Sequence, residues 1–212
     1  MTASGIFLMV SMIFSALSFI VLRISSLRGG KSIEHATPRG SAAAGVLYAF
    51  TYAFAPWAKE SARRHLPSYL AGIVYHFAIF TMIVLLVLTL FALEFEYPAD
   101  IILASLIGAG LLCGAGLLFK RILLAKMRAI SIPDDFFSNL IVDIALAAGI
   151  VYLLHPPAAA AFQIIGGLLA IYAPFSKLKH MVFLFTSRRY VGRHFGRRGV
   201  KPHARPLGAT HG

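Results

Sequence analysis

The stretch PSYLAGIVYHFAIFTMIVLLVLTLFAL, residues 67–93, decides the fold class of this chain. It contains no Asp, Glu, Lys or Arg, and it is long enough to cross a bilayer, which takes about 20 apolar residues in a helix. Four further segments are also long and apolar enough. We therefore predict an all-α polytopic membrane protein, a bundle of five transmembrane helices. The expected spans are about 5–22, 67–93, 100–119, 136–154 and 158–186.

The composition of the whole chain is typical of a membrane protein. Charged residues make up only 13% of the 212 residues and hydrophobic residues 58%, whereas a soluble domain carries about 25% charged residues. The formal net charge of +12 therefore indicates cationic loops on one side of a bilayer, and not a nucleic-acid-binding surface. A single cysteine, Cys113, excludes a disulfide framework and a cysteine-ligated zinc or iron–sulfur site within this chain.

Charge also predicts the topology. Residues 41–56, SAAAGVLYAFTYAFAP, form a sixth apolar stretch. If this stretch lies along the surface, all 20 Lys and Arg residues fall on the inside, and the outside keeps only Glu94, Glu96 and Asp100. The first span follows no basic residue, so we expect a retained anchor and not a signal peptide. We predict the N-terminus outside, the C-terminus inside, an interfacial or re-entrant element at 41–56 and a basic cytoplasmic tail at 187–212.

Two histidines fall inside the expected spans. His76 and His180 are expected ~14 Å and ~10 Å from the inner ends of the second and fifth spans, where ionisable groups are costly and usually functional. Two imidazoles at similar depth suit the two axial positions of a haem iron. The alternative is two structural histidines, each bonded to a backbone carbonyl. Gly72, Gly166 and Gly167 offer room for a flat ring, or allow close helix packing.

Asp143 is the one acidic residue expected well inside the bilayer. It shares a helical face with Asp135 and Asn139, at positions i, i+4 and i+8, and Asp135 is expected to cap the helix at its inner end. Three roles for Asp143 stay open. It can hold a proton for quinone chemistry, accept a bond from a haem-ligating imidazole, or be a neutral acid bonded to a neighbouring helix.

Two basic clusters, 59–64 and 177–205, lie on the predicted inner side. Their members include Arg63, Arg64 and Lys177. These cations can pair with haem propionates, with anionic lipid or with a soluble partner subunit, or they can be ordinary loop charge.

Several motifs resemble a known family. The stretch YAPFSKLKHMVFLF (172–185) with the basic tail after it resembles the last helix of the respiratory nitrate reductase gamma subunit family, which are b-type membrane cytochromes. One branch of that family serves heterodisulfide-reductase-like and sulfur-cycle membrane complexes. The stretches PWAKESARRHLPSYLAGIVYH (56–76), SIPDDFFSN (131–139) and GRHFGRRGV (192–200) resemble its cytochrome b subunits. The resemblance covers the five spans, and PFSKLKH is its most specific part.

The resemblance implies a cytochrome b of a prokaryotic cytoplasmic (inner) membrane that exchanges electrons with quinone. In this family two haems are stacked, each held by one histidine of the second span and one of the fifth. His76 and His180 match the pair nearer the cytoplasm, whereas the outer pair corresponds to Leu86 and Phe162. The chain is therefore expected to hold one low-spin bis-histidine haem b. An unusual second haem held by His155 and Met82 is the remaining alternative.

We accordingly predict a monohaem subunit of a quinone-linked oxidoreductase complex. His76 and His180 would ligate the iron; Gly72, Arg63, Arg64 and Lys177 would lie around the haem, and Asp143 would serve quinone. The chain has no substrate-converting domain of its own, so the expected partners are an iron–sulfur or flavin subunit on the cytoplasmic face, quinone and membrane lipid. A haemless membrane anchor or scaffold is the main alternative. A small transporter is disfavoured because no internal inverted repeat is evident.

Overall fold

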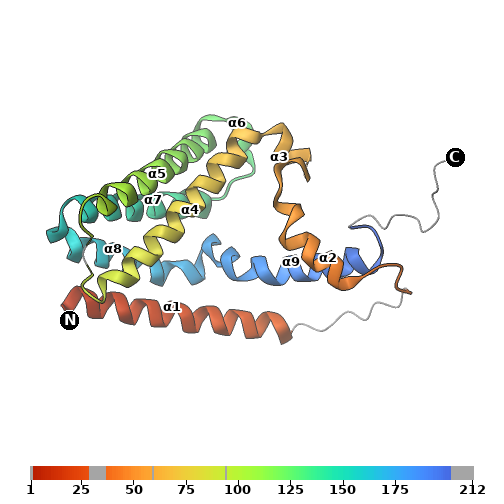
Figure 1. Ribbon diagram of the computed structural model, residues 1–212, viewed down its shortest axis with the longest axis horizontal. Coiled ribbons are helices and arrows are strands. Elements are labelled where there is room, and N and C mark those ends of the chain that lie inside the picture. Colours follow the sequence, from red (N-terminus) through yellow and green to blue (C-terminus); the bar gives the residue numbers. More distant parts are fainter. Residues whose placement is uncertain (1, 29–36, 59, 94, 202–212) are drawn as a thin grey trace. The chain divides into compact units, whose positions relative to one another are not determined.

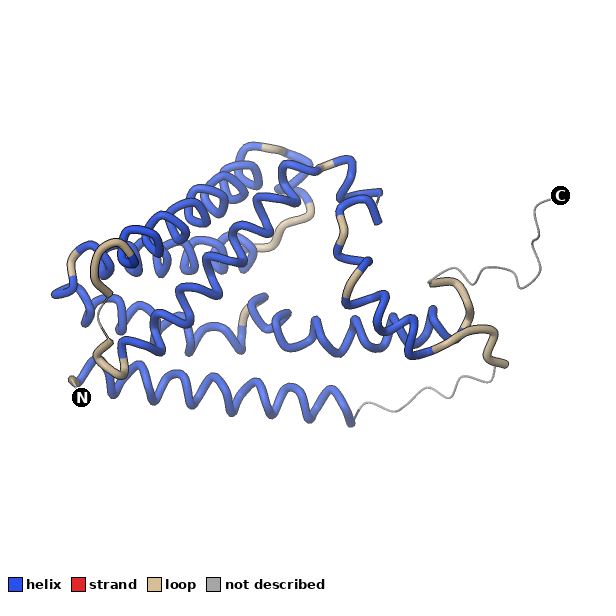
Figure 2. The backbone as a smooth tube through the Cα atoms, in the orientation of Figure 1, coloured by secondary structure: helices blue, strands red, loops and turns tan. Residues whose placement is uncertain are grey.

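The computed structural model describes residues 2–28, 37–58, 60–93 and 95–201, and these ranges are helical apart from short connections (Figures 1 and 2). The helices are α1 (Ala3–Arg28), α2 (Ala42–Phe50), α3 (Glu60–Arg64), α4 (Leu66–Thr89), α5 (Ala99–Leu123), α6 (Ala125–Ala129), α7 (Pro133–Leu154), α8 (Ala159–Tyr172) and α9 (His180–Arg197). Single 3-10 turns lie at Tyr52–Phe54, Pro56–Ala58, Pro156–Ala158, Ala173–Phe175 and Lys177–Lys179.

Five helical segments of the described chain are long and apolar enough to cross a membrane. This confirms the all-α class and a multi-pass membrane protein. Residues Ala42–Phe54 form a shorter apolar helix. The five segments are Ala3–Arg28, Leu66–Thr89, Ala99–Leu123, Pro133–Leu154 and Pro156–Phe175.

The chain divides into two compact units, which are described separately. Unit 1 comprises Met1–Leu22 and Pro67–Lys179, and unit 2 comprises Arg23–Leu66 and His180–Gly212, in both cases as far as the described residues extend. The apolar core of unit 1 is built from α1, α4, α5, α7 and α8, and it includes the fully buried side chains of Leu8, Met82, Ile107, Leu146 and Phe162.

The helix expected over 158–186 is interrupted. Helix α8 ends at Tyr172, the backbone at Ser176 is extended (φ −100°, ψ −177°), and α9 begins at His180. Pro174 explains the break, because proline has no N–H to donate and its ring clashes with the carbonyl four residues earlier. The last candidate span accordingly ends at Phe175. The expectation that His180 lies inside this span, at a depth similar to that of His76, is therefore wrong: His180 follows the end of the span by five residues and is the first residue of a separate helix.

Unit 2 pairs α2 with α9, which includes residues 187–197 of the expected tail. The two helices touch through glycine backbone: a Cβ on Gly192 would lie 2.7 Å from the Gly45 carbonyl oxygen, and one on Gly196 would lie 2.5 Å from that of Ser41. The carbonyl of Arg197 accepts the N–H groups of Arg39 and Gly40 at 2.8 and 3.0 Å. Close packing of this kind is what a small-xxx-small pattern allows.

Candidate functional site

His76 lies on α4 with its ring tied to the preceding turn of the same helix. Its Nδ1 is 2.6 Å from the carbonyl oxygen of Gly72. Because a carbonyl only accepts, Nδ1 carries the proton and donates, so the lone pair belongs to Nε2. Most metal-ligating histidines are oriented in this way, by a hydrogen bond from the ring nitrogen that does not bind the metal. The donor chemistry of His76 therefore fits an axial haem ligand that binds iron through Nε2.

The helix surface beside His76 is open. A Cβ on Gly72 would meet no atom within 4 Å, and His76, Phe77 and Phe80 are all exposed. A structural histidine would make the same bond to Gly72, so the bond alone does not separate the two interpretations. Among the described residues, the exposed apolar surface around it has room for a flat macrocycle.

His180 and two of the predicted arginines belong to unit 2. His180 is exposed at the first position of α9, so the two predicted ligands lie in different units. Arg63 and Arg64 are exposed in the last turn of α3. Arg64 holds the carboxylate of Glu60 at 2.5 Å, one helical turn away.

The other two glycines serve helix packing. A Cβ on Gly166 would lie 2.5 Å from Leu86 Cδ2, and one on Gly167 would lie 2.5 Å from Phe7 Cε1. The positions that correspond to the outer haem ligands are also closed, because Leu86 is 4% exposed and Phe162 is fully buried. Of the three glycines, Gly72 is the one with room for a ring.

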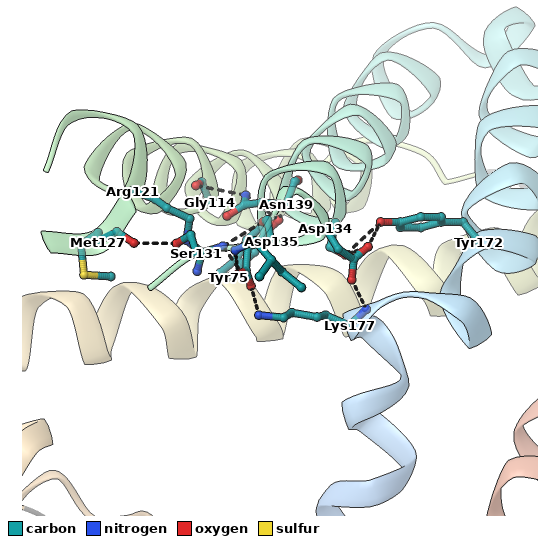
Figure 3. A network of polar contacts seen from close by, with 12 residues as sticks. Tyr75, Gly114, Arg121, Met127, Ser131, Asp134, Asp135, Asn139, Tyr172 and Lys177 are labelled. Atoms are coloured by element: carbon teal, nitrogen blue, oxygen red, sulfur yellow. Dashed lines mark hydrogen bonds and ion pairs between the residues drawn. The ribbon is translucent and has the colours of Figure 1, made fainter. Parts of the chain in front are cut away.

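Polar side chains at the start of α7 contact the residues at the break between α8 and α9 (Figure 3). We call this group the edge cluster. Asp134 accepts the backbone N–H of Lys177 at 2.6 Å and the hydroxyl of Tyr172. Asp135 accepts the Lys177 ammonium at 2.5 Å, and it caps α7 as expected by accepting the Ile132 N–H at 2.9 Å. Lys177 thus has carboxylate partners within unit 1.

A second cluster, the buried cluster, joins Tyr75 of α4, Gly114 of α5, and Asn139 and Asp143 of α7. The Asn139 amide donates to Asp143 Oδ2 at 2.9 Å, to the Tyr75 hydroxyl at 3.2 Å and to the Gly114 carbonyl at 3.3 Å. The expected i, i+4 contact between Asn139 and Asp143 is therefore present. A Cβ on Gly114 would collide with Asp143 Oδ1 and with the Tyr75 ring, so the cluster needs glycine there.

Asp143 itself is only 8% exposed and lies near the middle of α7. Its Oδ1 is buried and has no hydrogen-bond partner among the described residues. An unsatisfied buried oxygen is costly, and a neutral carboxyl is less costly in a membrane than a charged one. Of the three roles left open, holding a proton and being a neutral acid in a cluster that joins neighbouring helices both fit this geometry. The recorded hydrogen bond to Asp143 comes from Asn139 and not from an imidazole.

Sequence reasoning did not identify Tyr75, Gly114, Asp134 or Tyr172 as members of these clusters. Asp134 had a local signal, because an acidic residue directly after Pro133 is typical of a first helical turn. Tyr75 and Gly114 had none, since their partners come from other helices.

Comparisons with protein-family models, with curated proteins and with solved structures found no match to this chain. The resemblance to membrane cytochromes b therefore rests on the quoted motifs alone.

Proposed function

We propose that this chain is the membrane cytochrome b subunit of a quinone-linked oxidoreductase complex and binds a single low-spin haem b. One observation carries the proposal: exposed His76 donates through Nδ1 to the Gly72 carbonyl, which makes Nε2 the nitrogen that can bind iron. His180, in the PFSKLKH motif, is the proposed second axial ligand. A bound haem b would supply a reversible one-electron couple.

The protein would position this group and limit the number of haems to one. The Gly72 carbonyl fixes the tautomer and orientation of His76. Leu86 and Phe162 fill the places where a second pair of ligands would be needed. Arg63, Arg64 and Lys177 are the proposed partners of the propionates. Lys177 and Arg64 already bind Asp135 and Glu60, so they would bind propionate in exchange for these carboxylates.

Asp143 is the proposed proton-holding residue for quinone, which binds as an exchangeable ligand. Its burial, its hydrogen bond from Asn139 and an Oδ1 atom without a hydrogen-bond partner in the described part of the chain support this role. Proton transfer by a positioned carboxyl is general acid–base catalysis. The acidic group would thus couple electron transfer to proton uptake or release.

We propose that the chain lies in a prokaryotic cytoplasmic membrane, with its N-terminus outside and its C-terminus inside. The positive-inside distribution of the Lys and Arg residues supports this topology. An iron–sulfur or flavin subunit would then dock on the basic cytoplasmic face and exchange electrons with the chain.

The test is the amount of haem b per chain in the purified full-length protein, measured as the pyridine haemochrome against protein mass. The proposal predicts about one haem, as expected for a single bis-histidine pair, and loss of that haem in His76→Ala and in His180→Ala. His155→Ala is the matched control and should keep its haem. Two haems per chain would support the alternative in which His155 and Met82 hold a second haem. No haem, together with intact quinone turnover in the complex, would leave the scaffold alternative.

A further inference from the structure

Helix α9 of unit 2 presents three different surfaces around its axis. The surface that carries Phe185, Gly192 and Gly196 contacts α2, where the rings of Phe50 and Phe185 stack with centroids 6.3 Å apart. The other two surfaces lie on either side of this contact, at the positions that the helical repeat of 3.6 residues assigns to them.

One side of α9 is basic and the other is apolar. Arg189, Arg193 and Arg197 follow each other at intervals of four residues, and the first two are exposed; we call this set the arginine flank. Leu184, Val191 and Phe195 share the opposite side and are all exposed. A helix with a basic side and an apolar side is typical of elements that lie in a membrane interface.

Arg188 has a different role from the arginine flank. Its guanidinium donates to the Ala49 carbonyl at 3.2 Å and lies 4.3 Å above the Phe54 ring. This arginine therefore fastens α9 to the α2 segment. No such contact is recorded for the side chains of Arg189 and Arg193 among the described residues, and both residues are exposed.

Covalent connection keeps α9 close to a membrane surface. Its first residue follows Phe175, the end of a candidate span, by five residues, which is at most about 18 Å of extended chain. Trp57, the single tryptophan of the chain, is also part of unit 2 and is exposed. Tryptophan is enriched at membrane–water interfaces.

We propose that unit 2 is a lipid-binding element that recognises anionic phospholipids. Arg189 and Arg193 bind the headgroup phosphates, while Leu184, Val191, Phe195 and Trp57 enter the acyl boundary. The glycine contact with α2 lies between the basic and apolar sides of α9 and leaves both sides exposed. This inference requires a membrane protein but does not depend on haem binding.

The experiment uses the fluorescence of Trp57 in the full-length protein, reconstituted into phosphatidylcholine bilayers that contain phosphatidylglycerol. Brominated lipids quench tryptophan on contact. The measured quantity is the ratio of quenching by brominated phosphatidylglycerol to quenching by brominated phosphatidylcholine at equal mole fraction. Any other quencher in the protein affects both lipids equally and leaves this ratio unchanged.

The proposal predicts preferential quenching by the anionic lipid in the native protein. The double variant Arg189→Gln/Arg193→Gln should lose most of this preference, because each arginine near an anionic surface strengthens binding about fivefold. The double variant Arg28→Gln/Lys126→Gln removes the same charge at exposed positions outside the flank and should keep it. In the native protein, added salt should weaken the preference by screening, which tests the proposal without any substitution.

Equal quenching by the two lipids in the native protein would overturn the proposal. Quenching by aqueous iodide with no effect of either brominated lipid would also overturn it, because Trp57 would then face water and not lipid.

Discussion

Helix α4 carries two positions, ten residues apart, that the cytochrome family would use for ligands, and the two are built differently. At the first, His76 is exposed and Gly72 beside it has open space. At the second, Leu86 is buried against Gly166 of α8. The first position is available to a group outside the helix, whereas the second is part of the core of unit 1. One helix can therefore leave one of these positions exposed and bury the other.

The largest effect should come from exchanging these two side chains for alanine. His76→Ala should remove the haem and leave unit 1 folded, because the ring is exposed. Leu86→Ala should keep the haem but lower the free energy of unfolding by ~2–5 kcal/mol, because it leaves a cavity. Haem absorbance and thermal unfolding in detergent measure the two effects. If Leu86→Ala loses haem while its stability is unchanged, the contrast between the two positions is wrong.

Asp143→Asn should have the next largest effect. The amide keeps the shape of the side chain and can still bond within the buried cluster, but it cannot hold or release a proton. Quinone-linked electron transfer by the complex should fall about 100-fold, the lower end of general acid–base contributions. Haem content and stability should stay close to those of the native protein. Unchanged turnover would remove Asp143 from the quinone reaction.

A pair of glycine substitutions sharpens the comparison between open and filled positions. Gly166→Leu should destabilise the protein by ~1–3 kcal/mol, because the larger side chain overpacks the contact with Leu86. Gly72→Ala adds a Cβ in open space, so its folding stability should be unchanged or higher by up to ~1 kcal/mol from helix propensity. Thermal unfolding of the two variants is the measurement, and equal destabilisation would contradict the assignment of Gly72 to open surface.

The smallest effect is expected in the edge cluster. Lys177→Met removes an ion pair with Asp135 in which the lysine side chain is 48% exposed, so the loss in unfolding free energy should be at most ~1 kcal/mol. The effect should shrink further at high salt. Asp134→Ala is the sharper variant, because it leaves the Lys177 N–H and the Tyr172 hydroxyl without their acceptor. An equal effect of the two variants would show that the backbone contact adds nothing.

Five apolar spans were predictable because each is a local property of a continuous apolar segment, although the fifth ends at Phe175 and not near residue 186. The bond from His76 to Gly72 and the contact between Asn139 and Asp143 were accessible too, since both join residues four apart on one helix. Contacts between helices were not. Pro174 signals a break, but the sequence does not say that Asp134 will hold the chain after it.

The pairing of α2 with α9 shows the same limit. The sequence GRHFG has small residues four apart, a pattern that allows close approach but names no partner. Only the fold shows that Gly45, about 150 residues earlier in the chain, fills that role. Non-local contacts of this kind pack residues 187–197 of the expected basic tail, as part of α9, against α2.

The most direct test of the central claim is a spectroscopic identification of the axial ligands, because it reports the bonds to iron themselves. We would record near-infrared magnetic circular dichroism and electron paramagnetic resonance of the oxidised full-length protein, and of His76→Ala, His180→Ala and His155→Ala. The account predicts one low-spin bis-imidazole species that is lost in the first two variants and retained in the third. A folded chain without this species, or an unchanged signal in His76→Ala or in His180→Ala, would contradict it.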